Sequence, residues 1–253
     1  MQNPLIRQVL LLQSASRERK KQELFIIDGW KETQMSMKNG YLIQTLLIKK
    51  GADIKLSREY NSAEKIEVSE AVFDKIAYRG NTSKVVAVAR PKNHEPTRLV
   101  LSNNPLLLVL DAIEKPGNLG AMLRTADATG IDAVIVCDTA TDIYNPNVIR
   151  SSVGCVFSVP LAVASREDCL HYLKKHRIKI YTASLKASEN YLKQDYKQAS
   201  AFILGTEASG VNILWEKESD KNIIIPMHGQ NDSLNVSNTA AILLFEALRQ
   251  RTI

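Results

Sequence analysis

Short apolar runs alternate with helical patterns through the second half of the sequence, and this alternation restricts the fold more than any other feature. Residues 106–110 form an uninterrupted aliphatic run, which is typical of a strand buried on both faces. A helical pattern follows at 118–129, and a second apolar run lies at 133–136. Strands that alternate with helices in this way predict an α/β fold with a parallel sheet covered by helices.

The same pattern continues to the end of the chain. It predicts a helix near 146–153, a strand at 157–160, a helix at 166–176, strands at 178–182 and 201–204, a short segment at 211–215, a strand at 222–225 and a final helix from about 236 to 251. We therefore expect one α/β domain over residues 105–253.

A smaller α/β unit is predicted before this domain. Helical patterns at 5–12, 30–38 and 69–78 alternate with strand-like runs at 24–27, 45–48 and 85–89, and a polar stretch rich in Arg and Lys lies at 14–23. Residues 91–105 contain three prolines and little periodicity, so the domain boundary is expected near 92–104. The sequence thus predicts two domains, residues 1–95 and residues 105–253.

The excess positive charge is confined to the smaller unit. Residues 1–105 contain 18 Lys or Arg against 11 Asp or Glu, whereas residues 106–253 contain 15 against 16. A basic module joined to a neutral one suggests that the first part binds a polyanion such as RNA. On charge alone, a solvated basic surface explains the imbalance equally well.

The composition argues against a membrane, disulfide or metal protein. The longest aliphatic runs are too short to span a bilayer and the N-terminus lacks a secretory signal pattern, so we expect a cytoplasmic protein. Cys137, Cys155 and Cys169 are widely spaced, which favours buried thiols over a disulfide framework or a zinc site. His228 has no histidine or cysteine at metal-ligand spacing, and no metal is expected.

Three loops that follow predicted strands have unusual compositions, and in parallel sheets ligands bind at the carboxyl ends of the strands. The first is DAIEKPGNLGAMLR at 111–124, in which Asn118 opens a helix and Arg124 is followed by small residues. A capped helix with one surface arginine explains this loop as well.

The other two loops are rich in glycine or in small polar residues. ILGTEASGV at 203–211 suits a tight loop whose amides face a ligand, although it lacks the dinucleotide fingerprint and the phosphate-loop lysine. Glu207 is alternatively an ordinary exposed carboxylate. IPMHGQNDSLNVSN at 225–238 leads into the last helix, and Ser233 and Asn235 are alternatively turn and cap residues.

Taken together and in this order, the three segments resemble the motifs of the SpoU family of RNA ribose 2′-O-methyltransferases. PGNLGAMLRTADATG is similar to motif 1, ILGTEASGV to motif 2 and IPMHGQNDSLNVSNTAAILLFEALRQR to motif 3. The resemblance covers residues 106–253, and SLNVS before an Ala-rich helix is its most specific part. The stretch FIIDGWKETQMSM resembles, more loosely, the substrate-binding domain that many members carry.

The resemblance implies a SPOUT-type α/β fold with a C-terminal trefoil knot, preceded by a small α/β RNA-binding domain. It implies S-adenosylmethionine as the cofactor, bound in the knot, and a homodimer whose interface helps to form the active site. The implied reaction is methyl transfer to a ribose 2′-hydroxyl of structured RNA, with ribosomal RNA favoured over transfer RNA.

The resemblance also implies roles for individual residues. Arg124 takes or polarises the 2′-hydroxyl proton, and Asn118 orients the ribose or Arg124. Glu207 holds the substrate or the facing loop, while Ser233 and Asn235 organise the phosphate and the arginine. The implied cofactor-binding residues are Leu204, Gly205, Thr206, Gly210, Ile225, Met227, Leu234 and Val236. Because an arginine has a pKa above about 12, its action as the literal proton acceptor is left open.

The chain departs from the family pattern at two places. Lys115-Pro116-Gly117 precedes the motif 1 asparagine, where Asp-Pro is common, and Ala208 follows Glu207, where glycine is usual. Neither change removes a residue with an implied chemical role. The main alternative is a catalytically silent RNA-binding or ribosome-assembly protein of the same fold. A dinucleotide-dependent enzyme and a base methyltransferase fit the motifs less well.

Overall fold

The computed structural model describes residues 3–54, 63–78, 83–138, 141–187, 189–206 and 210–252. The chain divides into two compact units: Met1–Lys92 with Asp142–Ser158, and Asn93–Thr141 with Val159–Ile253. The chain therefore passes from one unit to the other three times. Unlike the two predicted domains, these units assign a short segment of the C-terminal half to the N-terminal unit.

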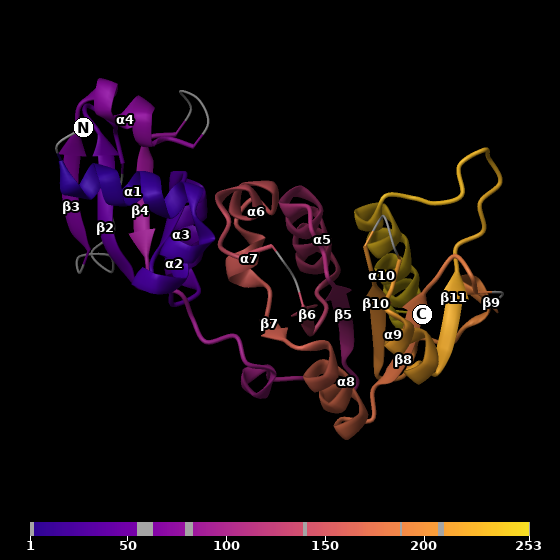
Figure 1. The fold of residues 1–253 in the computed structure, drawn as a ribbon. Helices are drawn as coiled ribbons and strands as arrows, with labels where there is room; N and C mark the ends of the chain where they lie inside the picture. Colours follow the sequence, from indigo (N-terminus) through magenta and orange to yellow (C-terminus); the bar gives the residue numbers. More distant parts are fainter. Residues whose placement is uncertain are drawn as a thin grey trace. The chain divides into compact units, whose positions relative to one another are not determined.

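The second unit is built on a seven-stranded sheet in which every described strand pair is parallel, with the order β7-β6-β5-β10-β8-β11-β9 (Figure 1). Its strands are β5 (Leu106–Asp111), β6 (Ala133–Cys137), β7 (Leu161–Ala164), β8 (Lys179–Ala183), β9 (Glu189–Asn190), β10 (Ser200–Leu204) and β11 (Lys221–Ile224). This confirms the parallel sheet predicted from the alternating pattern.

Helices cover both faces of this sheet. They are α5 (Pro116–Thr129), α8 (Arg166–Lys175), α9 (Ile213–Glu218) and α10 (Val236–Thr252), with short 3-10 turns η2 (Pro96–Arg98) and η3 (Tyr191–Lys193). On one face, Leu107 and Val109 of β5 pack in one cluster with Leu173 of α8 and Trp215 of α9. The alternate β5 side chains point to the other face, where α5 and α10 pack against each other. All β5 side chains are therefore buried, as a doubly covered strand requires.

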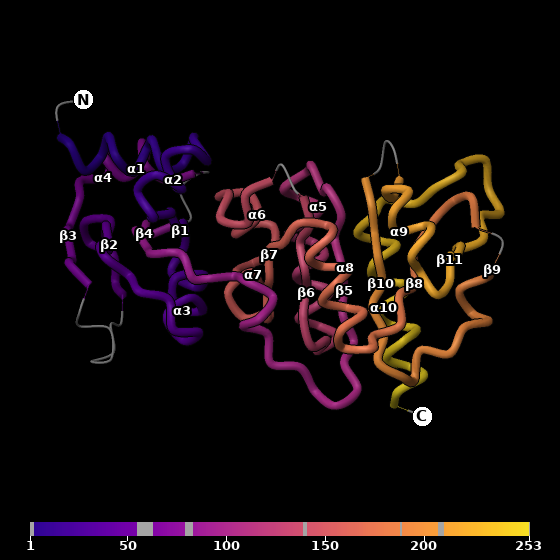
Figure 2. Tube along the Cα trace, turned by 60° about the horizontal axis from the view of Figure 1, so that its bottom comes forward, coloured from indigo at the N-terminus to yellow at the C-terminus, as the bar shows by residue number. Residues whose placement is uncertain are grey.

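The first unit contains a four-stranded sheet with the order β1-β4-β2-β3. Its elements are α1 (Pro4–Ser14), α2 (Ser16–Gln22), β1 (Phe25–Asp28), α3 (Trp30–Lys38), β2 (Ile43–Lys49), β3 (Glu64–Val68), α4 (Glu70–Ile76) and β4 (Val85–Ala89). Figure 2 shows α1, α2 and α4 on one side of this sheet and α3 on the other. The apolar side chains of α1 and α4 form the core with the sheet, since Val9, Leu12, Phe73 and Ile76 are fully buried.

The segment Asp142–Ser158 completes the first unit with α6 (Pro146–Ser151) and α7 (Cys155–Ser158). The ring of Tyr144 stacks on Phe25 of β1 with centroids 4.1 Å apart. Arg19 Nε of α2 lies 2.6 Å from Asp142 Oδ2, and the two side chains are 5% and 10% exposed. A buried ion pair and an aromatic cluster thus join this segment to residues more than a hundred positions earlier.

Three local predictions differ from the structure. The strand predicted at 157–160 is wrong, because 155–158 form the helical turn α7 and the strand begins at Leu161. Pro160 has no amide hydrogen, and only its carbonyl joins the ladder, accepting from Val134. The polar stretch at 14–23 contains helix α2, and the charged strand β3 was not predicted.

The structure also bears on the cysteines and on membrane-spanning helices. All three cysteines are buried free thiols, which confirms the burial predicted for them. Within the described part of the chain, the helices are all too short or too polar to cross a bilayer.

Candidate functional site

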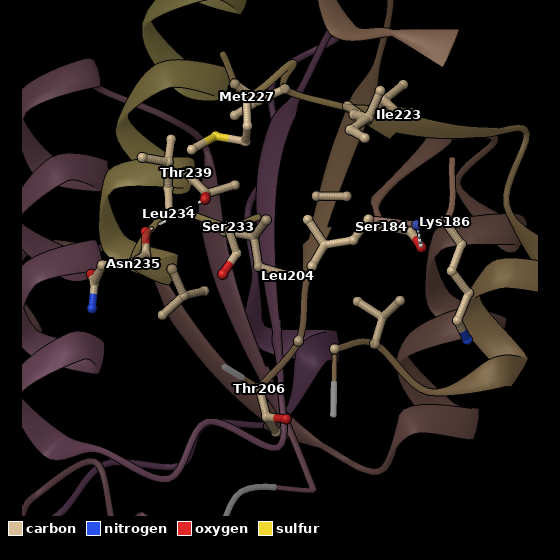
Figure 3. A pocket seen from close by; sticks show the side chains of 18 of the residues that line it. Ser184, Lys186, Leu204, Thr206, Ile223, Met227, Ser233, Leu234, Asn235 and Thr239 are labelled. Carbon is tan, nitrogen blue, oxygen red and sulfur yellow. Dashed lines mark hydrogen bonds between the residues drawn. The ribbon is translucent and has the colours of Figure 1, made fainter. Parts of the chain in front are cut away.

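A cavity of about 480 Å³ opens at the carboxyl ends of β8, β10 and β11. All eight residues that the family resemblance assigns to the cofactor line it: Leu204, Gly205, Thr206, Gly210, Ile225, Met227, Leu234 and Val236. Ser233 and Asn235, two of the expected catalytic residues, line it as well (Figure 3). The structure therefore brings the second and third sequence motifs together around one hollow.

The motif 2 loop is closed on itself beside this cavity. Thr206 N donates to Gly210 O at 2.9 Å, and Gly210 N donates to Thr206 O at 3.1 Å. A Cβ atom added to Gly205 would lie 2.1 Å from Gly210 O and 2.6 Å from the Val211 Cα. Only glycine allows this close approach of two backbone segments. Glu207, the predicted acid of this loop, lies outside the described residues.

Motif 3 meets motif 1 at the start of α10. The Asn235 side chain caps this helix, because its Oδ1 accepts from Ser237 N at 3.0 Å. Its Nδ2 also donates to Asn118 Oδ1 of α5 at 3.3 Å. Asn235 therefore caps α10 and also contacts the motif 1 helix α5. Ser233 lies two residues earlier, exposed, and donates to Asp232 Oδ1 at 3.2 Å.

Asn118 is not the N-cap of its helix, so the alternative explanation of this residue as a helix cap is wrong. Lys115 holds the cap position and Pro116 begins the helix, so Asn118 lies in the first turn. Arg124 follows six residues later, which places it about 9 Å further along the axis and about 120° around it. Its side chain is exposed and is not among the described residues that line the cavity.

The cavity also has polar lining residues that were not predicted. Ser184 and Lys186 follow β8, and Glu216 lies on α9. Ser184 Oγ donates to Glu216 Oε1 at 2.9 Å, while Lys186 Nζ lies 3.9 Å from Glu216 Oε2. No motif marks these positions in the sequence, since they come from a loop and a short helix of unremarkable composition.

A partly buried ion network lies at the carboxyl ends of the neighbouring strands. Asp111 ends β5 with a 2% exposed side chain, and its Oδ1 is 2.9 Å from Arg166 Nη2 of α8. Arg166 Nη1 is 2.9 Å from Asp138 Oδ2. Partial burial opposes the charge on Arg166, but the two carboxylates outweigh it and raise the pKa of this guanidinium. Because Asp111 Oδ2 also accepts from Asn212 N at 3.4 Å, the network fixes the end of the motif 2 segment.

The cavity fits the cofactor that the resemblance implies. Ligand cavities of cofactor size enclose about 300–1,000 Å³ and are mainly apolar, with a few polar groups. Here Leu204, Ile223, Ile225, Leu234 and Val236 provide apolar walls for a flat base, and the polar residues lie at the edges. Among the described residues, no cluster of three or more His, Cys, Asp or Glu side chains is placed to hold a metal ion.

Both units of the chain match known families. Residues 105–245 match the model of the SpoU rRNA Methylase family, and residues 3–87 match the MRM3-like substrate binding domain. The 23S rRNA (guanosine(2553)-2′-O)-methyltransferase RlmP of Bacillus subtilis (strain 168) is 31% identical over 229 residues, which cover 90% of each chain.

Solved structures of similar proteins agree with this. The SpoU methyltransferase AviRb from Streptomyces viridochromogenes, in complex with the cofactor AdoMet, has a TM-score of 0.88 and 26% identity, and the match covers 99% of both chains. A crystal structure described as an RNA 2′-O ribose methyltransferase has a TM-score of 0.85 and 36% identity, covering 100% of this chain and 98% of the other.

Proposed function

The chain belongs to the SpoU rRNA methylase family, and from this premise we propose that it transfers a methyl group from S-adenosylmethionine to a ribose 2′-hydroxyl of ribosomal RNA. The observation that carries the proposal is the cavity that all eight expected cofactor residues line, next to the Asn118–Asn235 contact. The relatives named as 23S rRNA 2′-O-methyltransferases support ribosomal RNA over transfer RNA as the substrate.

The residues around the cavity position the reactants. When bound, the cofactor supplies an electrophilic methyl group on its sulfonium. Gly205 lets the two backbone segments of the motif 2 loop approach each other closely beside the cavity, and the apolar side chains exclude water from the ligand. Such positioning supplies much of the rate enhancement in a transfer that needs no covalent enzyme intermediate.

The expected catalytic residues act on the acceptor ribose. The hydrogen bond between Asn118 and Asn235 fixes two amides at the mouth of the cavity, where they orient the ribose. Arg124 polarises the 2′-hydroxyl or stabilises its developing oxyanion through its guanidinium donors, and the hydroxyl proton leaves to solvent as the oxygen–methyl bond forms. Ser233 organises a substrate phosphate, and Glu207 holds the substrate or the facing loop.

We further propose the trefoil knot and the homodimer that are typical of this family. We place the proposed partner surface on α10, where Phe245 is 50% exposed. A second copy that packs there would bring additional residues to the site, which also involves Arg124, a residue that is not among the described residues lining the cavity. No metal takes part in the proposed mechanism.

We propose different roles for the two parts of the chain. Residues 1–95 bind the RNA and residues 105–253 carry the methyl transfer, as the substrate-binding match and the excess of Lys and Arg in the first part support. The cytoplasm, where ribosomal RNA of bacterial relatives is made, is the proposed location.

The test is transfer of radiolabelled methyl from S-adenosylmethionine to total RNA that lacks this modification, followed by nucleoside analysis. We expect the label in a 2′-O-methylated nucleoside of ribosomal RNA. Label in a methylated base would refute ribose transfer. Cofactor binding without label in any RNA would leave the protein without an accepted substrate, and absence of cofactor binding would favour the silent RNA-binding alternative.

A further inference from the structure

One wall of the cavity carries charge that no sequence motif accounts for. Among the described lining residues, Glu216 supplies the single carboxylate and Lys186 the single ammonium. The neighbouring Trp215 is fully buried in the core and fixes helix α9. Its position leaves the next residue, Glu216, to face the cavity.

The Glu216 carboxylate retains acceptor capacity for a ligand. A carboxylate has about four acceptor sites. Within the described part of the chain, its hydrogen-bond donor is Ser184, at 2.9 Å from Oε1, and Lys186 lies at a loose 3.9 Å from Oε2. The Glu216 side chain is only 17% exposed. A largely buried carboxylate is costly to desolvate unless further donors reach it, and a ligand in the cavity is placed to provide them.

We propose that Glu216 accepts hydrogen bonds from the vicinal hydroxyls of the cofactor's own adenosine ribose and thereby selects an intact nucleoside. This inference rests on the proposed function and deepens it. Dinucleotide-binding folds use an acidic residue for the same chemistry, because two neighbouring hydroxyls donate in parallel to one carboxylate.

The charge next to Glu216 favours the ribose over the cofactor's amino-acid end. Figure 3 shows Lys186 on the opposite side of the cavity from Asn235, which is one of the residues proposed to act on the acceptor RNA. The ribose and the amino-acid chain are both attached to the sulfonium sulfur, so the direction of the methyl does not distinguish between them. The ammonium of the amino-acid end would have to share the carboxylate with Lys186, whereas neutral hydroxyls are not repelled.

The test combines a residue change with a ligand change. Dissociation constants are measured by calorimetry for S-adenosylhomocysteine and its 2′,3′-dideoxy analogue, on the wild type and on Glu216→Gln. We expect the wild type to bind the dideoxy analogue roughly 10- to 100-fold more weakly, as lost hydrogen bonds to a charged group imply. Glu216→Gln should bind S-adenosylhomocysteine more weakly and should discriminate much less between the two ligands.

Glu218→Gln is the matched control, because it removes the same charge from the same helix, where Glu218 pairs with Lys174 outside the cavity lining. It should behave as the wild type. The proposal would be overturned if Glu216→Gln raised the dissociation constants of both ligands equally, or raised neither of them. A wild type that binds neither S-adenosylhomocysteine nor S-adenosylmethionine would instead refute the proposed function itself.

Discussion

Replacing Gly205 by alanine tests whether the closed motif 2 loop shapes the cavity. The added methyl would lie 2.1 Å from Gly210 O, so the two backbone segments must separate by more than an ångström to reach ordinary contact. Such a shift breaks the two hydrogen bonds between Thr206 and Gly210, which measure 2.9 and 3.1 Å. At about 1 kcal/mol for each bond, with some overpacking strain added, the cost is about 2–3 kcal/mol.

This cost should appear mainly as lost cofactor affinity, because the loop can open locally. We expect the dissociation constant of S-adenosylmethionine to rise roughly 30- to 160-fold by calorimetry, since 1.36 kcal/mol corresponds to about tenfold. Gly229→Ala is the control, as nothing lies within 4 Å of the added methyl there. A Gly205→Ala protein with wild-type affinity and melting temperature would refute the steric argument.

Three further substitutions test the roles of individual side chains. Arg124→Ala should abolish methyl transfer, because it removes the proposed catalytic guanidinium. The melting temperature and the cofactor affinity should stay unchanged, because the side chain is exposed, and normal turnover would exclude the catalytic role. Arg19→Met leaves Asp142 buried without its partner and should lower the free energy of unfolding by about 3–5 kcal/mol in urea denaturation, with recovery in the Arg19→Met/Asp142→Leu double variant. Lys20→Gln with Lys21→Gln, both exposed on α2, should reduce the salt dependence of RNA binding, and an unchanged slope of log K against log salt concentration would place the RNA surface elsewhere.

The regular parts of the fold were predictable because their side chains repeat. The doubly buried strand at 106–110 shows as an aliphatic run, and the parallel sheet follows from the alternation. Helix α2 was not predicted, because its one inward side chain is Arg19, whose partner Asp142 lies 123 positions away. The stretch at 157–160 was wrongly predicted as a strand for a similar reason. Its apolar side chain Phe157 packs against Phe25 of β1, with ring centroids 6.0 Å apart, and not as part of the predicted strand.

The sequence predicted the cavity residues that lie in the family motifs, and it did not predict those that lie outside them. Gly205 and Leu234 lie in segments with a family resemblance, and the structure places both at the cavity. The contact between Asn118 and Asn235 joins two such segments across more than a hundred residues, which spacing alone does not reveal. Glu216 gave no signal, because a carboxylate in a short helix looks like any solvated charge until the fold turns it toward a cavity.

The threefold passage of the chain between its units has a consequence for engineering and for the evolution of substrate choice. An N-terminal module that was cut at residue 92 would leave behind Asp142 and Tyr144, which are the partners of its own Arg19 and Phe25. A chimaera that exchanges this module between relatives must therefore transplant Asp142–Ser158 together with it. Changes in the two stretches should accordingly occur in concert when a lineage acquires a new target.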